Sequence, residues 1–228
     1  MPQTAFIAGA SRGLGHAIAT ELATRGWQVI GTVRDPAART PLHGLADASD
    51  GRVEVEHLDI TEPGQLPPLR ERLAGRRLDV LFVNAGATNN PATPIGEVPT
   101  ADFVDVMVTN ALSPMRVIEA LQDLVPADGL IGAMSSGQGS ITNNTAGSRE
   151  VYRASKAALN MLMRSFAARQ ADRALLLMAP GWIRTALGGD QAPFTLEETV
   201  PLIVDVLLAK LGKPGLEFLD RTGETVPW

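Results

Sequence analysis

Short apolar runs alternate with longer amphipathic stretches from one end of the chain to the other, and this alternation constrains the fold more than any other feature. Runs that are apolar on both faces, separated by helical patterns, are typical of parallel strands joined by crossover helices. The pattern predicts strands at 4–8, 28–33, 53–58, 79–83, 130–135, 174–179 and 216–219. It predicts helices at 14–25, 64–75, 101–125, 151–170 and 195–211, with a further short helix after Arg34.

The 228 residues contain no internal repeat, no low-complexity segment and no linker, because prolines and glycines lie at the ends of the predicted elements. A chain of this length can bury the core of one α/β domain. The sequence therefore predicts a single domain over residues 1–228. Its fold is expected to be a Rossmann-like, doubly wound parallel sheet of about seven strands with helices on both faces.

The charge balance argues against nucleic acid and anionic membranes as partners, since 20 basic against 25 acidic residues give a net charge of −5. The stretch 101–127 is apolar but carries charges such as Asp102 and Arg116, so it is not expected to span a membrane. The N-terminus lacks the basic start of a signal peptide. Without cysteine there is no disulfide and no thiolate metal site. We expect a soluble, cytoplasmic protein.

Three glycines, Gly9, Gly13 and Gly15, lie directly after the first predicted strand and at the start of a helix. Glycines in this context allow a tight turn and a close approach of the backbone to a pyrophosphate, which free N–H groups and the helix dipole favour. The spacing differs from the usual G-x-G-x-x-G pattern. A glycine-rich turn without a ligand therefore stays an alternative.

Tyr152, the only tyrosine, is four residues from Lys156, so both side chains share one face of the predicted helix. A tyrosine has a pKa near 10, which a nearby ammonium group lowers. This pair indicates a general acid and base whose phenol is tuned by the lysine. The alternative is an ordinary helix residue beside a solvated lysine.

Four motifs follow one another along the chain: Gly-x-x-x-Gly-x-Gly at 9–15, Asn-Ala-Gly at 84–86, Tyr-x-x-x-Lys at 152–156 and Pro-Gly at 180–181. With them the sequence resembles the short-chain dehydrogenase/reductase family over essentially its whole length. The segments 34–36, 152–156 and 218–220 are similar to the small carbonyl reductases related to sniffer and C-factor proteins. The resemblance implies an oxidoreductase that transfers hydride reversibly between a nicotinamide cofactor and a small carbonyl or alcohol substrate. It also implies a homo-oligomer, either a dimer or a tetramer.

The resemblance assigns catalytic roles to four residues. Tyr152 would be the general acid or base, and Lys156 would tune the phenol and bind the ribose. Asn110 would disturb its helix and hold a water that links the lysine to solvent; Pro114, which lacks an N–H for the carbonyl of residue 110, predicts the same disturbance. A capping or hydrogen-bonded interior asparagine is the alternative. Ser136 would orient the substrate carbonyl.

The resemblance gives this role to the second serine of the pair, and strand alternation is expected to point Ser135 to the other face of the sheet. The segment 137–150 is longer than is usual in the family, so Gln138 and Ser140 remain lesser candidates for this role.

Two arginines favour NADP(H) over NAD(H), because Arg12 in the glycine turn and Arg34 after the second strand could both bind a 2′-phosphate. Asp35 argues the other way, although the family's NAD-selecting acid matches Val33 here. The resemblance implies cofactor contacts from Gly9, Ser11, Arg12, Gly13, Leu14, Gly15, Arg34, Asp59, Ile60, Asn84, Ala85, Gly86, Tyr152, Lys156, Pro180, Gly181, Ile183 and Thr185.

The substrate pocket is expected to include Gln138, Trp182 and Phe194, with the segment 186–198 as a mobile lid. The three histidines lack metal-ligand spacing, so no metal is predicted. One alternative function is a nucleotide-binding sensor or a C-factor-like signalling module with little or no turnover. A sugar-nucleotide epimerase or dehydratase is less favoured, because only 17 residues follow Leu211.

Overall fold

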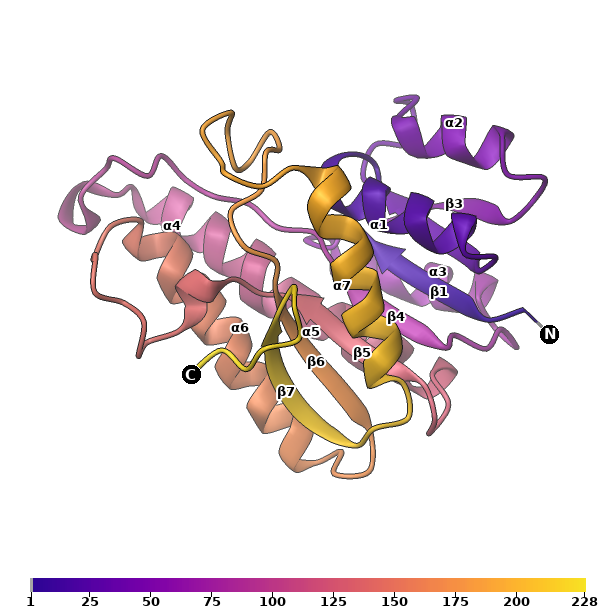
Figure 1. Ribbon diagram of the computed structural model, residues 1–228. Coiled ribbons are helices and arrows are strands. Elements are labelled where there is room, and N and C mark those ends of the chain that lie inside the picture. Colours follow the sequence, from indigo (N-terminus) through magenta and orange to yellow (C-terminus); the bar gives the residue numbers. More distant parts are fainter. Residues whose placement is uncertain (1) are drawn as a thin grey trace.

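A parallel sheet of seven strands forms the centre of the computed structural model, which describes residues 2–228 (Figure 1). The strand order is β3-β2-β1-β4-β5-β6-β7, and every neighbouring pair is parallel. The strands are β1 (Thr4–Ala8), β2 (Gln28–Val33), β3 (Val53–His57), β4 (Val80–Val83), β5 (Leu130–Met134), β6 (Ala174–Ala179) and β7 (Gly215–Asp220). The helices are α1 (Gly13–Thr24), α2 (Pro41–Asp47), α3 (Leu66–Arg72), α4 (Thr100–Met107), α5 (Ser113–Leu121), α6 (Glu150–Ala168) and α7 (Leu196–Lys210). The predicted doubly wound fold is confirmed.

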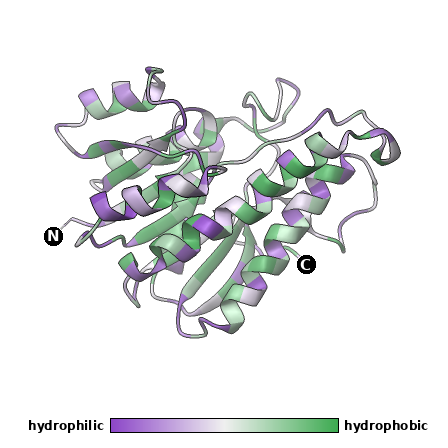
Figure 2. Ribbon diagram, turned by 180° about the vertical axis from the view of Figure 1, so that it is seen from behind, coloured by the Kyte–Doolittle hydropathy of each residue, from purple (hydrophilic) through white to green (hydrophobic). Residues whose placement is uncertain are grey.

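Each face of the sheet has its own hydrophobic core, because side chains along a strand alternate between faces. In β1, Phe6 and Ala8 belong to the core beneath α3, α5 and α6, whereas Ala5 and Ile7 belong to the core beneath α1 and α7. Figure 2 shows central strands that are mainly hydrophobic, while the helices mix hydrophobic and hydrophilic residues. Burial on both faces explains why the five central strands are apolar runs in the sequence, whereas the edge strands β3 and β7 are less buried and include charged residues.

The topology places a crevice at the carboxyl ends of β1 and β4. The chain runs from β1 outward to β2 and from β4 in the opposite direction to β5, so adjacent loops separate at this edge. Ligands of doubly wound proteins bind at such switch points. Segments distant in sequence, each following a strand, meet there.

The long helix predicted at 101–125 is present but interrupted. A π-helical turn, Val108–Leu112, separates α4 from α5, and Pro114 lies in the first turn of α5. Because a proline cannot donate the backbone hydrogen bond expected at its position, the helix widens by one residue before it. The disturbance predicted from Pro114 is confirmed.

The range 186–198 predicted as a lid overlaps α7, because this helix begins at Leu196. The Thr195 hydroxyl accepts a hydrogen bond from the Glu198 amide at 3.2 Å, and the Glu198 carboxylate accepts one from the Thr195 amide at 3.0 Å. This capping box fixes the helix start. Residues 196–198 are therefore helical. Within residues 2–228 no helix is long and apolar enough to cross a membrane.

Candidate active site

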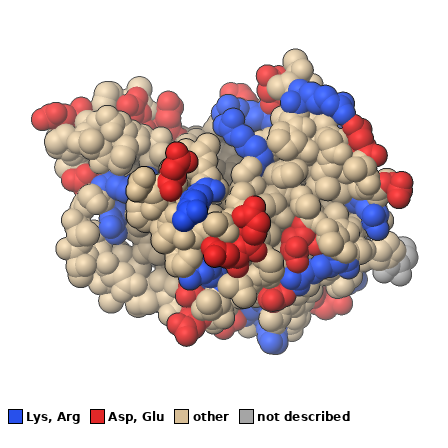
Figure 3. Space-filling model, turned by 45° about the horizontal axis from the view of Figure 1, so that its top comes forward, with Lys and Arg blue, Asp and Glu red and all other residues tan. Residues whose placement is uncertain are grey.

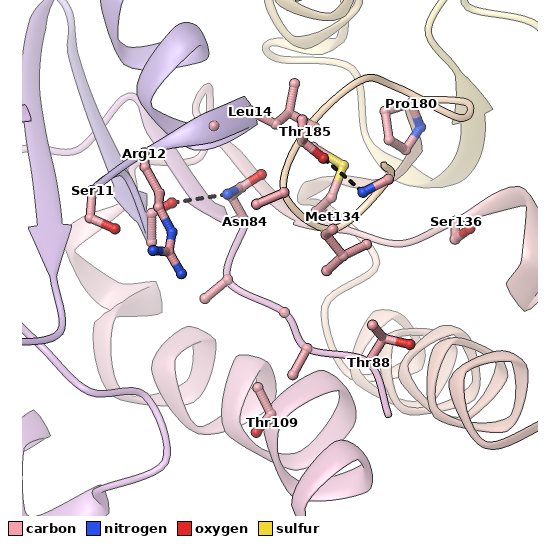
Figure 4. A pocket seen from close by; sticks show the side chains of 18 of the residues that line it. Ser11, Arg12, Leu14, Asn84, Thr88, Thr109, Met134, Ser136, Pro180 and Thr185 are labelled. Carbon is pink, nitrogen blue, oxygen red and sulfur yellow. Dashed lines mark hydrogen bonds between the residues drawn. The ribbon is translucent and has the colours of Figure 1, made fainter. Parts of the chain in front are cut away.

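A cavity of about 920 Å³ opens at the carboxyl edge of the sheet, lined by segments that follow β1 through β6. Figure 4 shows side chains from these segments converging on it. The residues predicted from sequence that line it are Gly9, Ser11, Arg12, Gly13, Leu14, Arg34, Asp59, Ile60, Asn84, Ala85, Gly86, Ser136, Gln138, Tyr152, Lys156, Pro180, Gly181, Trp182, Ile183 and Thr185. Gly15, Asn110, Ser140 and Phe194 are not in its lining.

The glycine turn needs its glycines for different reasons. Gly9 has φ +84°, and a Cβ there would lie 2.7 Å from the Cβ of Ala85. A Cβ on Gly15 would lie 2.1 Å from the carbonyl oxygen of Gly9, so Gly15 allows α1 to pack against the turn. Gly13 has φ +58°, and no atom lies within 4 Å of the position its Cβ would take. The turn is therefore tightly packed behind Gly9 and Gly15 and open at Gly13.

Two side chains hold this turn against the sheet. The Asn84 amide donates a hydrogen bond to the Gly9 carbonyl at 2.9 Å. Figure 4 marks a hydrogen bond of the Asn84 amide with a dashed line. The Gly9 amide donates to the Thr32 hydroxyl, also at 2.9 Å. Thr32 lies in β2, lines the cavity and was not predicted. Its signal in the sequence is a single polar residue inside an apolar strand.

The segment after β2 contributes Arg34 and Asp35 to the cavity wall, and the glycine turn contributes Arg12. Neither arginine forms an ion pair with another described residue. His57 Nε2 donates to the Arg34 carbonyl at 2.6 Å, which holds the Arg34 backbone in place. The Asp35 carboxylate accepts a hydrogen bond from the Ala37 amide at 2.9 Å, so it caps its own turn. This end of the cavity therefore offers two positively charged side chains.

Tyr152 and Lys156 lie one turn apart on α6, with the Lys156 Nζ 5.8 Å from the centre of the Tyr152 ring. The ammonium group donates a hydrogen bond to the Met134 carbonyl at 2.9 Å, and burial lowers the pKa of Lys156 to about 8. Burial also raises the pKa of Tyr152, against the opposing effects of a hydrogen bond with Ser136 and the positive charge of Arg149. The predicted lowering of the tyrosine pKa by Lys156 is not found, because desolvation dominates in the protein alone.

Both serines at the end of β5 line the cavity, but their hydroxyls have different partners. The Ser135 hydroxyl is engaged within the protein, because it donates to Asn160 Oδ1 at 2.6 Å. Ser136 Oγ accepts a hydrogen bond from the Gln138 amide at 3.1 Å and lines the cavity. Ser140 is buried elsewhere. The geometry favours Ser136 as the serine that meets a ligand, with Gln138 beside it.

Asn110 is fully buried within the π-helical turn and does not line the cavity. Its Oδ1 accepts from the Ala87 amide at 2.8 Å, and its Nδ2 donates to the Ala87 carbonyl at 2.8 Å and to Ser155 Oγ at 2.9 Å. The side chain therefore joins the loop after β4 to α6. It positions the strand-end loop next to the helix that carries Tyr152.

Two aromatic residues predicted for the substrate pocket have different positions. Trp182 lines the cavity, and its Nε1 donates to the Gly188 carbonyl at 2.7 Å. Phe194 does not line it, because its backbone pairs with Ile183 in an isolated bridge and its ring lies 3.8 Å from the guanidinium of Arg221. The structure thus supports only Trp182 as an aromatic wall.

Arg149 is a cavity residue that the sequence did not indicate. Its guanidinium carbon lies 5.5 Å from the centre of the Tyr152 ring, and it immediately precedes α6. A loop residue of this kind carries no periodic signal, so only the folded loop brings it to the tyrosine.

Charge and metal-binding capacity complete the description of the site. On the face shown in Figure 3, acidic and basic side chains are interspersed around a hollow. Among residues 2–228, no group of three or more histidine or carboxylate side chains could hold a metal ion.

The comparisons with known proteins identify the family. The family model described as short chain dehydrogenase matches residues 3–194. The chain therefore belongs to the short-chain dehydrogenase family of oxidoreductases.

Similar proteins include the C-signal of Myxococcus xanthus, 34% identical over 155 residues, which are 66% of this chain and 93% of that protein. A crystal structure described as a short-chain dehydrogenase/reductase from Burkholderia multivorans with bound NADP is 61% identical, with a TM-score of 0.98 and full coverage of both chains. The carbonyl reductase Sniffer of D. melanogaster is 26% identical, with a TM-score of 0.88 and full coverage of both chains. The predicted resemblance to sniffer and C-factor proteins is confirmed.

Proposed function

We propose that this protein is an NADP(H)-dependent carbonyl reductase that interconverts a small carbonyl compound and its alcohol. The observation that carries the proposal is the placement of Tyr152, Lys156 and Ser136 on the wall of the cavity into which the glycine turn opens. Family membership supports hydride-transfer chemistry, and the carbonyl reductase Sniffer supports the substrate class.

The residues around the glycine turn fit an NADP cofactor. Gly13 has an open surface where phosphate oxygens could approach backbone N–H groups at the start of α1. Arg12 and Arg34 would bind the 2′-phosphate, since a guanidinium pairs with phosphate through two parallel hydrogen bonds. Asp35 is engaged in its own turn, which weakens the case for NAD. The Burkholderia multivorans protein, whose structure contains NADP, supports the same choice.

The remaining cofactor contacts are proposed from the cavity lining. Asp59 and Ile60 would contact the adenine, and Asn84, Ala85 and Gly86 would line the floor beneath the dinucleotide. The segment after β6, which includes Pro180, Gly181, Ile183 and Thr185, would hold the nicotinamide amide. When bound, the reduced cofactor supplies the hydride. Fixing its ring and the carbonyl in one cavity removes a large entropic part of the barrier.

The protein's own residues would then manage the proton. Because burial raises the pKa of Tyr152, the phenol is protonated at neutral pH and can donate its proton to the carbonyl oxygen during reduction. Ser136 Oγ–H would donate a hydrogen bond to the same oxygen. Lys156 would bind the ribose, and Asn110 would hold the loop after β4 against α6.

Oligomerisation and cellular location stay predictions. Exposed apolar side chains on α4 and α6, such as Phe103, Val104 and Met161, support a homo-oligomer that covers these helices. Sedimentation equilibrium of the purified protein tests this expectation. A monomer at micromolar concentration would contradict it.

The activity is tested by NADPH and NADH oxidation over a panel of aldehydes, ketones and quinones. The proposal expects turnover of at least one carbonyl class and a preference for NADPH. Tight nucleotide binding without turnover of any substrate would favour the signalling alternative. Failure to bind either nucleotide would contradict both functions.

A further inference from the structure

Arg149 has a backbone conformation that is unusual for its residue type. It has φ 62° and ψ 41°, and Asp50 is the only other non-glycine residue with a positive φ among those described. The left-handed region disfavours residues with a Cβ, and such conformations often occur at functional sites. The conformation places the guanidinium over the Tyr152 ring, 5.5 Å from its centre, on the cavity wall.

The guanidinium has unused hydrogen-bonding capacity. Arg149 Nε is buried, yet it has no hydrogen-bond partner in residues 2–228, and the side chain forms no ion pair there. The adjacent Glu150 is exposed and does not pair with it. A buried donor without a partner is unfavourable by about 1–3 kcal/mol, so it indicates a group that a ligand would satisfy.

No acidic side chain lines this end of the cavity. The lining contains two carboxylates, Asp35 and Asp59, which follow β2 and β3. These strands are three and four places from β5 in the sheet, or about 14 and 19 Å away at the usual strand spacing. Near Tyr152 the charged lining residues are Arg149 and Lys156. The field at the reactive end is therefore positive.

We propose that Arg149 recognises an anionic group, a carboxylate or a phosphate, on the carbonyl substrate, and so is a specificity-determining residue. The proposal rests on the proposed reductase function. A guanidinium near an aromatic ring can still use its N–H groups for bidentate pairing with an oxyanion. Trp182 would provide an apolar wall for the part of the substrate between the carbonyl and the anion.

The test compares 4-formylbenzoate, its neutral methyl ester and 4-formylphenyl phosphate as substrates with NADPH. The readout is the ratio of kcat/KM for each anion to that for the ester, because a ratio cancels any effect of Arg149 on Tyr152 itself. Arg149→Gln is expected to lower one or both ratios about 10- to 150-fold, the range of a hydrogen bond to a charged group. The anion with the larger fall identifies the source of the charge. Arg149→Lys, which keeps the charge, is expected to lower these ratios less.

Arg153→Gln is the matched control, because Arg153 lies one turn along α6, holds the Ser148 carbonyl at 2.6 Å and does not line the cavity. Unchanged ratios in Arg149→Gln, or an equal fall in Arg153→Gln, would overturn the inference. Calorimetric binding of 4-formylbenzoate and of its ester to the NADP complex tests the anion site independently of the proposed reductase function. Arg149-dependent binding without turnover of any aldehyde would refute the reductase function and retain the anion site. Equal binding of acid and ester would overturn the anion site.

Discussion

Replacing Lys156 with methionine tests the energetic effect of a buried ammonium group on the wall of the cavity. The side chain is 3% exposed, and its ammonium group donates to the Met134 carbonyl at 2.9 Å. Burial lowers its pKa from 10.5 to about 8, because the charged form loses its hydration. Methionine keeps an unbranched side chain and removes the titrating group.

The sign of the pH dependence of stability follows from the protons bound by the folded and the unfolded chain. Between pH 8 and 10.5 the unfolded chain holds the lysine proton that the native protein has lost, so the free energy of unfolding rises with pH. The shift from 10.5 to about 8 corresponds to about 3 kcal/mol in total. About 2 kcal/mol of this lies between pH 7 and pH 9.5. Below pH 8 the native protein bears the full free-energy penalty of burying the charged ammonium group.

The assay is urea unfolding of nucleotide-free protein at pH 7 and pH 9.5, followed by circular dichroism. Relative to Lys156→Met, the wild type is expected to gain about 2 kcal/mol of stability between these pH values. Lys213→Met removes an exposed lysine and serves as the control. Parallel pH dependences of the wild type and Lys156→Met would show that burial does not lower the pKa of Lys156, and a change of the same size in the control would show that the effect is not specific to Lys156.

Three further substitutions probe the cavity and its support. Asn110→Ala removes three hydrogen bonds of a fully buried amide and is expected to lower the free energy of unfolding by about 2–4 kcal/mol; a loss below about 1 kcal/mol would contradict its positioning role. Arg34→Gln is expected to weaken NADPH binding about 10- to 100-fold and leave NADH binding unchanged in fluorescence titrations, whereas equal effects would argue against a 2′-phosphate contact. Gly9→Ala would place a Cβ 2.7 Å from that of Ala85 at φ +84°, so thermal melting should show a loss of more than about 2 kcal/mol, and a wild-type Tm would be inconsistent with this packing.

The sheet was predictable because its five central strands are buried on both faces and therefore form nearly continuous apolar runs. Each of the seven predicted strands begins and ends within one residue of the observed one. The parallel order explains why motifs far apart in sequence meet, since each follows a strand and all strands end at one edge. Pro114 likewise predicted a local disturbance of the helix, which the structure shows as a π-helical turn.

Features that depend on tertiary contacts were not predictable. The sequence places Lys156 four residues from Tyr152, but the pKa of the phenol is set mainly by burial, which spacing does not reveal. Phe194 was expected in the pocket, yet its backbone pairs with Ile183 and turns the ring to Arg221. Arg149 lies next to the tyrosine because its own backbone is left-handed, a conformation that the sequence does not reveal.

The proton-donating role of Tyr152 is tested by NADPH oxidation with an aldehyde that the wild type reduces. The wild type and Tyr152→Phe are measured side by side at matched nucleotide saturation. Phenylalanine keeps the ring and removes only the hydroxyl that would donate the proton. If Tyr152 donates the proton, the variant keeps wild-type nucleotide affinity and its kcat falls about 100- to 10,000-fold. A variant that binds NADPH normally and retains a kcat within tenfold of the wild type would contradict the role of Tyr152.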